Sequence, residues 1–430
     1  MNSFKSLILA FISSFGLICS HAQTSFDIAM QFRPRFEQRL GYGTLPSAGS
    51  KSAFFISERA RLNVGFKSKY VKMYMSLQDV RTWGSETQTQ NIASFALHEG
   101  WAEVFVKDNI SFKLRRQELV YDDSRLFGNA DWGQQARAHD AAVFKFQQKG
   151  TTLHVGGAFN QASEGFFGTY YGLNNYKALA FLWFNQKFVA DKLKLSFYAV
   201  TDGFSADTSL HQNKVYFRGT VGPMLHVNTK GVKANVTFFT QFGKDTYQKD
   251  ILAFFASAYV EYTVKKIVSL GVGYDFISGN DASDISNKRN NKFNTLYATN
   301  HKFYGHMDYF QNLPKDTKGG GLHDAYFKFK AMPNAKGSVG FDAHYFLLAN
   351  KVKNLAVPGQ YLKLPLGFEL DVYGSYKPIE YIELTAGYST LFAAASMEAL
   401  KGGSRKQFAG WGFVMLNVNP TIFKWEKEKK

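Results

Sequence analysis

The stretch RRQELVYDDSRLFGNADWGQQARAHDAAVFKF, residues 115–146, decides the fold. Both of its ends alternate between polar and apolar side chains with a period of two, which is typical of β-strands that have one wet and one apolar face. We predict strands at roughly 110–121 and 135–147, joined by a polar loop with glycines as turn points. Soluble sandwiches also alternate, but here the polar face keeps returning to arginine. The stretch therefore favours a membrane β-barrel with an arginine-lined lumen.

The first 23 residues, MNSFKSLILAFISSFGLICSHAQ, have the features of a secretory signal peptide. Lys5 provides the positive charge, residues 7–18 form an apolar region, and Ser20-His21-Ala22 fits a small-residue cleavage site. An apolar region of about 12 residues is too short to cross a bilayer as a helix. We expect a signal peptide at residues 1–22 and a single outer-membrane barrel domain at 23–430.

Cys19 is the only cysteine of the sequence. Leu17 and Ile18 precede it without the small residue that a lipoprotein signal needs beside the cysteine, so we do not expect a lipid anchor. The mature chain would contain no cysteine, which excludes disulfides and thiolate chemistry.

The composition points to a barrel. Aromatic residues make up 17%, with 42 Phe and 23 Tyr, and these residues suit both strands and lipid-facing positions. The mean hydropathy of −0.24 excludes a helical membrane protein but suits strands of which one face is wet. The formal net charge of +17 raises nucleic-acid binding as an alternative. We expect no nucleic-acid partner, because the arginines recur along separate strands and a signal peptide precedes them.

Alternation continues through the chain and predicts an all-β, transmembrane antiparallel barrel of about 18 strands. The strands are expected at 24–37, 53–66, 70–78, 97–106, 110–121, 135–147, 154–160, 176–184, 193–200, 215–222, 232–242, 254–264, 268–276, 322–329, 339–346, 366–374, 382–390 and 410–418. Short turns alternate with long polar connections, as periplasmic turns and extracellular loops do in outer-membrane barrels. A large soluble propeller or β-helix is the alternative, but each requires a repeat of fixed length, which we do not find.

The first two strands fix a register. Pro34 inside 24–37 indicates a strand end or a bulge. Alternation directs one set of side chains to the lumen and the other to lipid. The lumenal set is Arg33, Arg35, Arg59 and Arg61, and the lipid-facing set is Phe32, Phe36, Leu62 and Val64.

Several segments resemble the alginate-export porin family of outer-membrane β-barrels. They are FRPRFEQRLGY (32–42), ISERARLNV (56–64), SLQDVRTWG (76–84), LHEGWAEV (97–104), residues 116–141, NTLYATNHKFYGHMDYF (294–310), Gly321–Asp324, LGFELD (366–371) and WGFVMLNVNPTIF (411–423). The resemblance implies an eighteen-stranded barrel and passage of an acidic polysaccharide through an arginine-rich lumen narrowed by inward segments. Its motifs include Arg33, Arg35, Arg59, Arg61, Arg116, Arg125 and Arg137. Many outer-membrane barrels end on an aromatic residue, whereas here KWEKEKK follows Phe423.

We therefore predict an outer-membrane porin, not an enzyme, that passes anionic solutes passively. Candidate solutes are an acidic, alginate-like polysaccharide, a uronate or another small carboxylate, because arginine keeps its charge and its planar fork suits carboxylates. The candidate path residues are Arg33, Arg35, Arg59, Arg61, Arg115, Arg116, Arg125, Arg137 and Arg218. A barrel enzyme and a plugged structural barrel remain alternatives, and the arginines could instead pair with carboxylates and stiffen the wall. Outer-membrane lipid is an expected partner, and a monomer is expected rather than a trimer.

Metal chemistry has little support in the sequence. His301, His306 and Asp308 are candidates, but a spacing of five is expected to put the two histidines on opposite faces of a strand or loop. The acidic segment GNDASD (279–284), with Asp281 and Asp284, could hold a structural calcium, although it lacks the full twelve-residue loop pattern. We expect no other cofactor and find no local catalytic motif.

Overall fold

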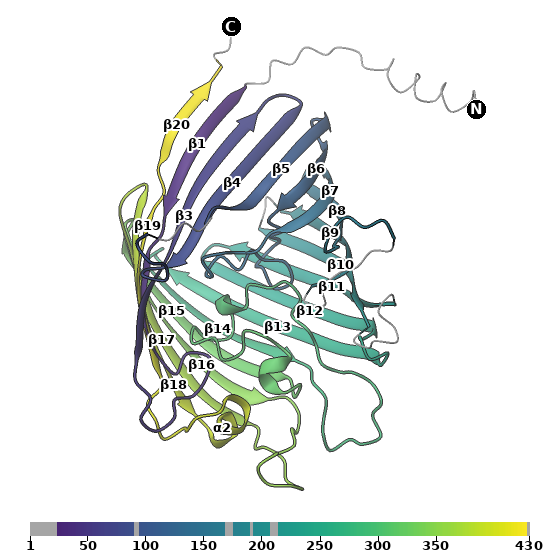
Figure 1. The fold of residues 1–430 in the computed structure, drawn as a ribbon, viewed down its shortest axis with the longest axis vertical. Helices are drawn as coiled ribbons and strands as arrows, with labels where there is room; N and C mark the ends of the chain where they lie inside the picture. The colour runs from purple at the N-terminus through teal and green to yellow at the C-terminus, as the bar shows by residue number, and fades with distance from the viewer. Residues whose placement is uncertain (1–23, 90–93, 168–174, 190–191, 207–213, 428–430) are drawn as a thin grey trace, which may run out of the picture.

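The computed structural model describes residues 24–427 except 90–93, 168–174, 190–191 and 207–213 (Figure 1). The predicted signal peptide and its cleavage site lie outside the described residues.

The described chain forms one closed antiparallel β-barrel of 18 strands, as predicted. The strand segments are Ser25–Phe32 (β1), Arg35–Leu40 (β2), Ala53–Lys67 (β3), Val71–Thr82 (β4), Ala96–Lys107 (β5), Ile110–Gln117 (β6), His139–Gln148 (β7), Thr151–Phe159 (β8), Ala178–Phe188 (β9), Leu193–Ser205 (β10), Val215–Thr229 (β11), Val232–Lys244 (β12), Asp250–Val264 (β13), Val268–Ile277 (β14), Leu322–Asn334 (β15), Gly337–Leu348 (β16), Pro365–Ile379 (β17), Ile382–Ala393 (β18), Gly410–Val418 (β19) and Thr421–Glu426 (β20). The described helices are the short α-helix Ala395–Lys401 (α2) and the 3-10 turns Asn300–Lys302 (η1) and Lys315–Thr317 (η2), and none of these is long or apolar enough to cross a membrane.

Twenty segments make eighteen strands because two strands are interrupted at a proline. β1 and β2 flank Pro34, and β19 and β20 flank Pro420, since proline cannot donate to the ladder. The barrel closes where these two strands meet, with Phe423 opposite Ile28 and Phe413 opposite Glu37. The predicted irregularity at Pro34 is confirmed.

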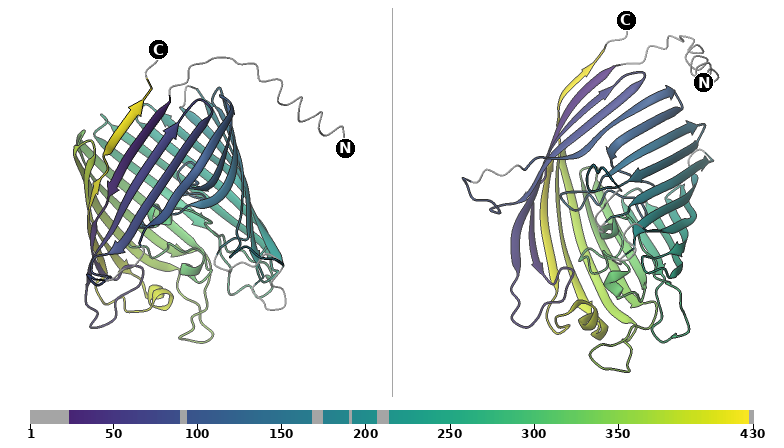
Figure 2. Two further views of the ribbon diagram at one scale, coloured as in Figure 1. Left: turned by 45° about the horizontal axis from the view of Figure 1, so that its top comes forward. Right: turned by 45° about the vertical axis from the view of Figure 1, so that its right-hand side comes forward.

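The two ends of the barrel differ. Short connections of two to four residues link alternate strands at one end, where β1 begins and β20 ends (Figures 1 and 2). The longer connections lie at the opposite end, as predicted for an outer-membrane barrel. In outer-membrane barrels the short turns generally face the periplasm and the longer loops the outside.

The predicted strands are confirmed, but two of them are shorter than expected. β6 ends at Gln117 rather than near residue 121, and β7 begins at His139 rather than near residue 135. The reason is that residues 118–138 leave the wall and fold into the barrel. We call residues 118–138 the first inward segment and residues 278–321 the second inward segment.

The two inward segments pack against each other inside the ring of strands (Figures 1 and 2). Gly128 N donates to Tyr297 O at 2.9 Å, and Tyr297 N donates to Leu126 O at 3.0 Å. Apolar side chains of both segments are almost fully buried: Leu126, Phe127, Phe293, Met307, Tyr309 and Phe310. Removing such side chains from water is favourable, so the segments form a core within the barrel rather than loose loops.

Candidate functional site

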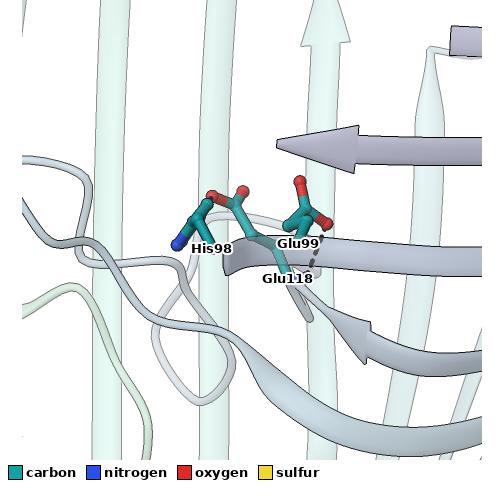
Figure 3. Close-up of side chains that lie close together, drawn as sticks. All are labelled: His98, Glu99 and Glu118. Carbon is teal, nitrogen blue, oxygen red and sulfur yellow. Dashed lines mark hydrogen bonds and ion pairs between the residues drawn. The ribbon is translucent and has the colours of Figure 1, made fainter. Parts of the chain in front are cut away.

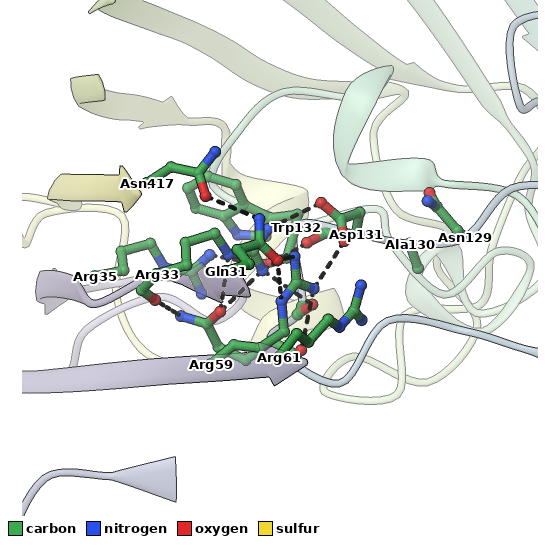
Figure 4. A network of polar contacts seen from close by, with 12 residues as sticks. Gln31, Arg33, Arg35, Arg59, Arg61, Asn129, Ala130, Asp131, Trp132 and Asn417 are labelled. Atoms are coloured by element: carbon green, nitrogen blue, oxygen red, sulfur yellow. Dashed lines mark hydrogen bonds and ion pairs between the residues drawn. The ribbon is translucent and has the colours of Figure 1, made fainter. Parts of the chain in front are cut away.

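An arginine cluster on the first strands meets the first inward segment (Figure 4). Alternation turns Arg33, between β1 and β2, and Arg59, on β3, to the same inner side of the wall. Both reach one carboxylate: Arg33 Nη1 lies 2.9 Å from Asp131 Oδ2, and Arg59 Nη1 lies 2.8 Å from Asp131 Oδ1. Burial would raise the pKa of Asp131, but the two guanidiniums outweigh burial and hold that pKa below its usual range. Asp131 therefore ties the segment to the wall as an ionised carboxylate.

Gln134 adds neutral hydrogen bonds to the same contact. Its Oε1 accepts from Arg33 Nε at 3.0 Å, and its Nε2 donates to Ser57 Oγ at 3.2 Å. Arg33 and Arg59 are almost completely buried under this contact. Their main effect is thus to anchor the inward segment, and a solute would feel them through their field rather than by direct contact.

Trp132 forms the centre of an aromatic and cationic stack. The Arg35 guanidinium lies 4.0 Å above the indole, and the His301 ring stacks on it at 4.4 Å and 13°. Arg35 also donates to the Trp132 carbonyl at 2.6 Å and to Glu37 at 2.9 Å. The stack joins the wall, the first inward segment and the second inward segment at one point.

Guanidiniums outnumber carboxylates in this region. Five guanidiniums have only two carboxylate partners between them: Arg33 and Arg59 share Asp131, Arg35 and Arg39 share Glu37, and Arg61 pairs with neither. Arg61 donates through Nε to Gln78 Oε1 at 2.8 Å, and its Nη2 has no partner. The Arg39 side chain is one-third exposed and lines a cavity of about 560 Å³. Arg39 is therefore the member most open to a solute, and Arg61 is the member without a carboxylate partner.

The first inward segment has a second anchor at Asp122. Its carboxylate accepts from Trp183 Nε1 at 2.8 Å, Ser196 Oγ at 2.8 Å and Tyr198 OH at 2.6 Å, all from β9 and β10. Burial would raise the pKa of Asp122, but His226 and these donors lower it below the usual range. The segment is thus fixed to two separate parts of the wall.

Arg125 and Arg218 lie in ion pairs with the wall. Arg125 is buried, with Nη1 at 2.5 Å from Asp275 Oδ2 on β14. Arg218 on β11 lies 2.5 Å from Asp202 Oδ2, which also accepts from Tyr297 OH at 2.9 Å. For these two arginines the structure agrees with the alternative that arginines pair with carboxylates and stiffen the barrel wall.

The structure corrects the placement of Arg115 and Arg116. Arg115 is exposed beside the outward-facing Leu114, and Arg116 bonds the Leu97 carbonyl and the exposed Asp140. At Arg115 the cause is a φ of 88°, which breaks the alternation that the sequence pattern assumed. Arg116 lies two residues after Leu114 and shares its outward face by alternation. Neither residue belongs to the inner arginine cluster.

Arg137 lies at the junction of the two inward segments. Its Nη1 donates to Gly128 O at 3.3 Å and to Ala298 O at 3.1 Å, one carbonyl from each segment. It lines a cavity of about 500 Å³ between them. A third cavity of about 420 Å³ lies toward the short turns, beside Lys72 and Lys113. Open space therefore lies on both sides of the first inward segment.

Three possible metal ligands come together at the start of the first inward segment (Figure 3). His98, Glu99 and Glu118 have ligand atoms within 4.8 Å of one another, and no other group of three such residues is this close among the described residues. His98 Nε2 lies 2.8 Å from Glu118 Oε1, and Glu118 Oε2 accepts from Asn129 at 2.8 Å. Glu118 thus already has hydrogen-bond partners in His98 and Asn129, and these bonds fix the start of the first inward segment to β5.

The other candidate ligands do not converge. Asp281 and Asp284 each accept from the serine two residues later, so each carboxylate closes its own turn. The expectation that His301 and His306 face apart is wrong, because their rings stack at 5.4 Å. The second inward segment is compact here, and His301 bonds Asp308 at 2.8 Å.

Comparison with known proteins places the fold. No protein-family profile and no curated protein matches the chain. Solved structures do match: OccAB1 of Acinetobacter baumannii has a TM-score of 0.62 at 12% identity over 93% of this chain and 97% of that one. OpdL of Pseudomonas aeruginosa has a TM-score of 0.61 at 10% identity, covering 93% and 99%. OccK9 (OpdG) of the same species has a TM-score of 0.59 at 11% identity, covering 92% and 98%.

The fold is that of an outer-membrane porin. The chain is accordingly a protein of the cell outer membrane, as predicted. Identities of this size establish architecture and not substrate. The resemblance to the alginate-export porins stays a prediction, because none of these matches bears on it.

The sequence pattern missed the residues that receive the arginines. Asp131 and Trp132 lie in the loop predicted between the two strands, and the sequence pattern assigns no partner to either. The one signal in the sequence for these partners was the acidic residues that lie between two arginine-containing strands. Alternation could not use this signal, because it describes which face of a strand a residue is on and not which residues meet across the lumen.

One glycine controls how closely the second inward segment approaches the wall. Gly305 has a φ of +78°, and a Cβ there would lie 2.4 Å from Glu369 Oε1. Gly305→Ala should destabilise the docking of this segment by about 1–3 kcal/mol through strain and overlap. Faster amide hydrogen exchange at residues 300–310 would report it. Gly359→Ala is the matched control, because that glycine has a φ of +85° and open space around it. Equal exchange in both variants would contradict the prediction.

Proposed function

We propose that the protein is a passive outer-membrane channel for small anionic solutes. The observation that carries the proposal is the excess of guanidiniums beside the first inward segment, where four arginines share two carboxylates and Arg61 has none. A narrow passage with low-dielectric walls focuses such a field and raises the local concentration of anions.

Carboxylates of the opposite wall weaken this field little. Asp275, Asp324 and Asp342 on β14–β16 each have a cationic or histidine partner, respectively Arg125, His344 and Lys328. All three carboxylates are nearly inaccessible. These three carboxylates therefore offer a passing solute little negative charge.

Small solutes fit the geometry better than a polysaccharide. The first inward segment is tied to the wall at Asp122, Arg125 and Asp131, and it packs on the second segment. A polymer would require these contacts to open, whereas a small anion needs only the space on either side of the segment. The sequence predicted either an acidic polymer or a uronate or other small carboxylate. Measuring the size of the solutes that block or cross the channel distinguishes these two substrate classes.

Ion selectivity in a planar bilayer tests the proposal. The wild-type channel should give a reversal potential of the anion-preferring sign in a KCl gradient, and Arg39→Gln with Arg61→Gln should reduce it. The reduction should fade near 1 M salt, where the screening length is about 3 Å. Arg116→Gln is the matched control, because its side chain lies on the outward face.

Cation preference in the wild type, or a double variant with the wild-type reversal potential, would contradict the proposal. The alternatives give other results. A plugged structural barrel has no conductance, and packing of both segments inside the ring is the observation that favours it. A barrel enzyme predicts a serine that an organophosphate labels.

A further inference from the structure

The cavity between the two inward segments has an unusual charge balance. It has a volume of about 500 Å³, and its lining combines Trp132 and Arg137 of the first segment with His301 and Lys315 of the second. No aspartate or glutamate is among the residues that line it. A cavity of this size suits a small organic ligand, and its charged groups suit an anion.

Arg137 presents an open guanidinium edge to this cavity. Only Nη1 has partners, the Gly128 and Ala298 carbonyls, and no hydrogen bond within the described chain uses Nε or Nη2. No described carboxylate lies within 4 Å of this guanidinium. Two adjacent open donors of an arginine match the two oxygens of a carboxylate.

Lys315 supplies a second cation from the other segment. It is the first residue of η2, its side chain is exposed, and no described carboxylate pairs with it. Its ammonium can move toward a bound anion, because a lysine stem is flexible and nothing fixes this one. The two cations therefore come from different segments and face one cavity.

The rest of the wall is neutral and polar. The amide and hydroxyl side chains that line the cavity are Asn294, Thr295, Thr299, Asn300, Gln311 and Asn312. Gln311 and Asn312 are exposed, so their amides are open to a ligand. An amide both donates and accepts, and so fits a ligand whose groups do the same, which hydroxyls do. A plain aliphatic acid offers these amides no hydrogen bond beyond its carboxylate.

We propose that this cavity is a binding site for a sugar acid of monosaccharide size, with the carboxylate on Arg137 and Lys315 and the hydroxyls on the amide wall. The site rests on the proposed function, because such a ligand arrives through the anion-preferring channel. Binding would make the protein selective among small anions and not only between anions and cations.

Calorimetry on the detergent-purified full chain tests the site with D-glucuronate as the probe, and D-glucose and acetate as comparisons. Glucuronate should bind more tightly than either comparison, because only it has both the charge and the hydroxyls. Lys315→Gln should weaken glucuronate binding about tenfold, since a hydrogen bond between charged groups is lost. Lys336→Gln, at an exposed short turn, should leave binding unchanged.

Arg137→Gln should weaken binding at least as much, although this change also removes bonds to both segments. Lys315→Gln removes no bond within the described chain, so its effect on glucuronate binding alone tests the site. Glucuronate binding no tighter than that of glucose or acetate, or insensitive to Lys315→Gln, overturns the site.

The reversal potential separates this outcome from failure of the proposed function. A wild-type channel that prefers anions but does not bind glucuronate overturns the site alone. A channel that prefers cations overturns the proposed function, and with it the route by which the ligand would arrive, even if calorimetry detects binding.

Discussion

Replacing residues 119–137 by a short Gly-Ser linker should raise the single-channel conductance several-fold. The first inward segment occupies the lumen, and its anchors Asp122, Arg125 and Asp131 lie within the deleted residues. β6 and β7 pair with each other along their length, so a short linker can still connect them and the wall should close. Conductance of the purified variant in planar bilayers measures the effect.

The deletion should change anion preference at low salt less than it changes conductance. It frees Arg33 and Arg59 from their shared carboxylate Asp131, but the wider passage focuses their field less. Deleting residues 355–358 is the control, because this part of an outer loop is largely exposed, with Leu355 78% accessible. A wild-type conductance in the 119–137 variant would show that the second inward segment alone sets the narrowest point.

The strands could be predicted from the sequence because alternation is a local property. Each of the eighteen predicted strands alternates over about ten residues, and this local pattern is enough to predict a barrel wall. The ends of β6 and β7 could not be predicted, because Leu119, Val120 and Tyr121 continue the strand pattern. They are apolar for another reason, since Leu119 and Tyr121 are buried inside the barrel by packing between distant parts of the chain.

The functional residues were predictable only in part. Register placed Arg33, Arg35 and Arg59 on the inner face, where the structure has them. It gave no warning of the positive φ at Arg115, which a non-glycine residue seldom adopts. Nor could it pair Arg125 with Asp275, 150 residues away, because such contacts depend on how the inward segments fold.

Arg125→Gln should destabilise the docked first inward segment by about 3 kcal/mol. The pair with Asp275 is buried, and removing one partner leaves a buried charge without its counter-ion. The loss should stay near the lower end of the range for buried pairs, because Asp275 keeps a hydrogen bond from Ser257 Oγ at 2.6 Å. The Arg125 guanidinium also lies 4.0 Å above Phe303, so the variant weakens the contact with the second segment.

A double-mutant cycle separates charge from packing in this result. Asp275→Asn alone should also be destabilising. Arg125→Gln with Asp275→Asn should cost less than the sum, because position 275 then carries no unpaired charge and only the partly exposed Asp123, 3.4 Å from Arg125 Nε, loses a partner. Amide hydrogen exchange at residues 121–130 measures the docking, and the frequency of brief current increases reports its effect on the channel. If the two single effects simply add, the pair does not hold the segment and the packing of Phe127 and Leu126 must do so instead.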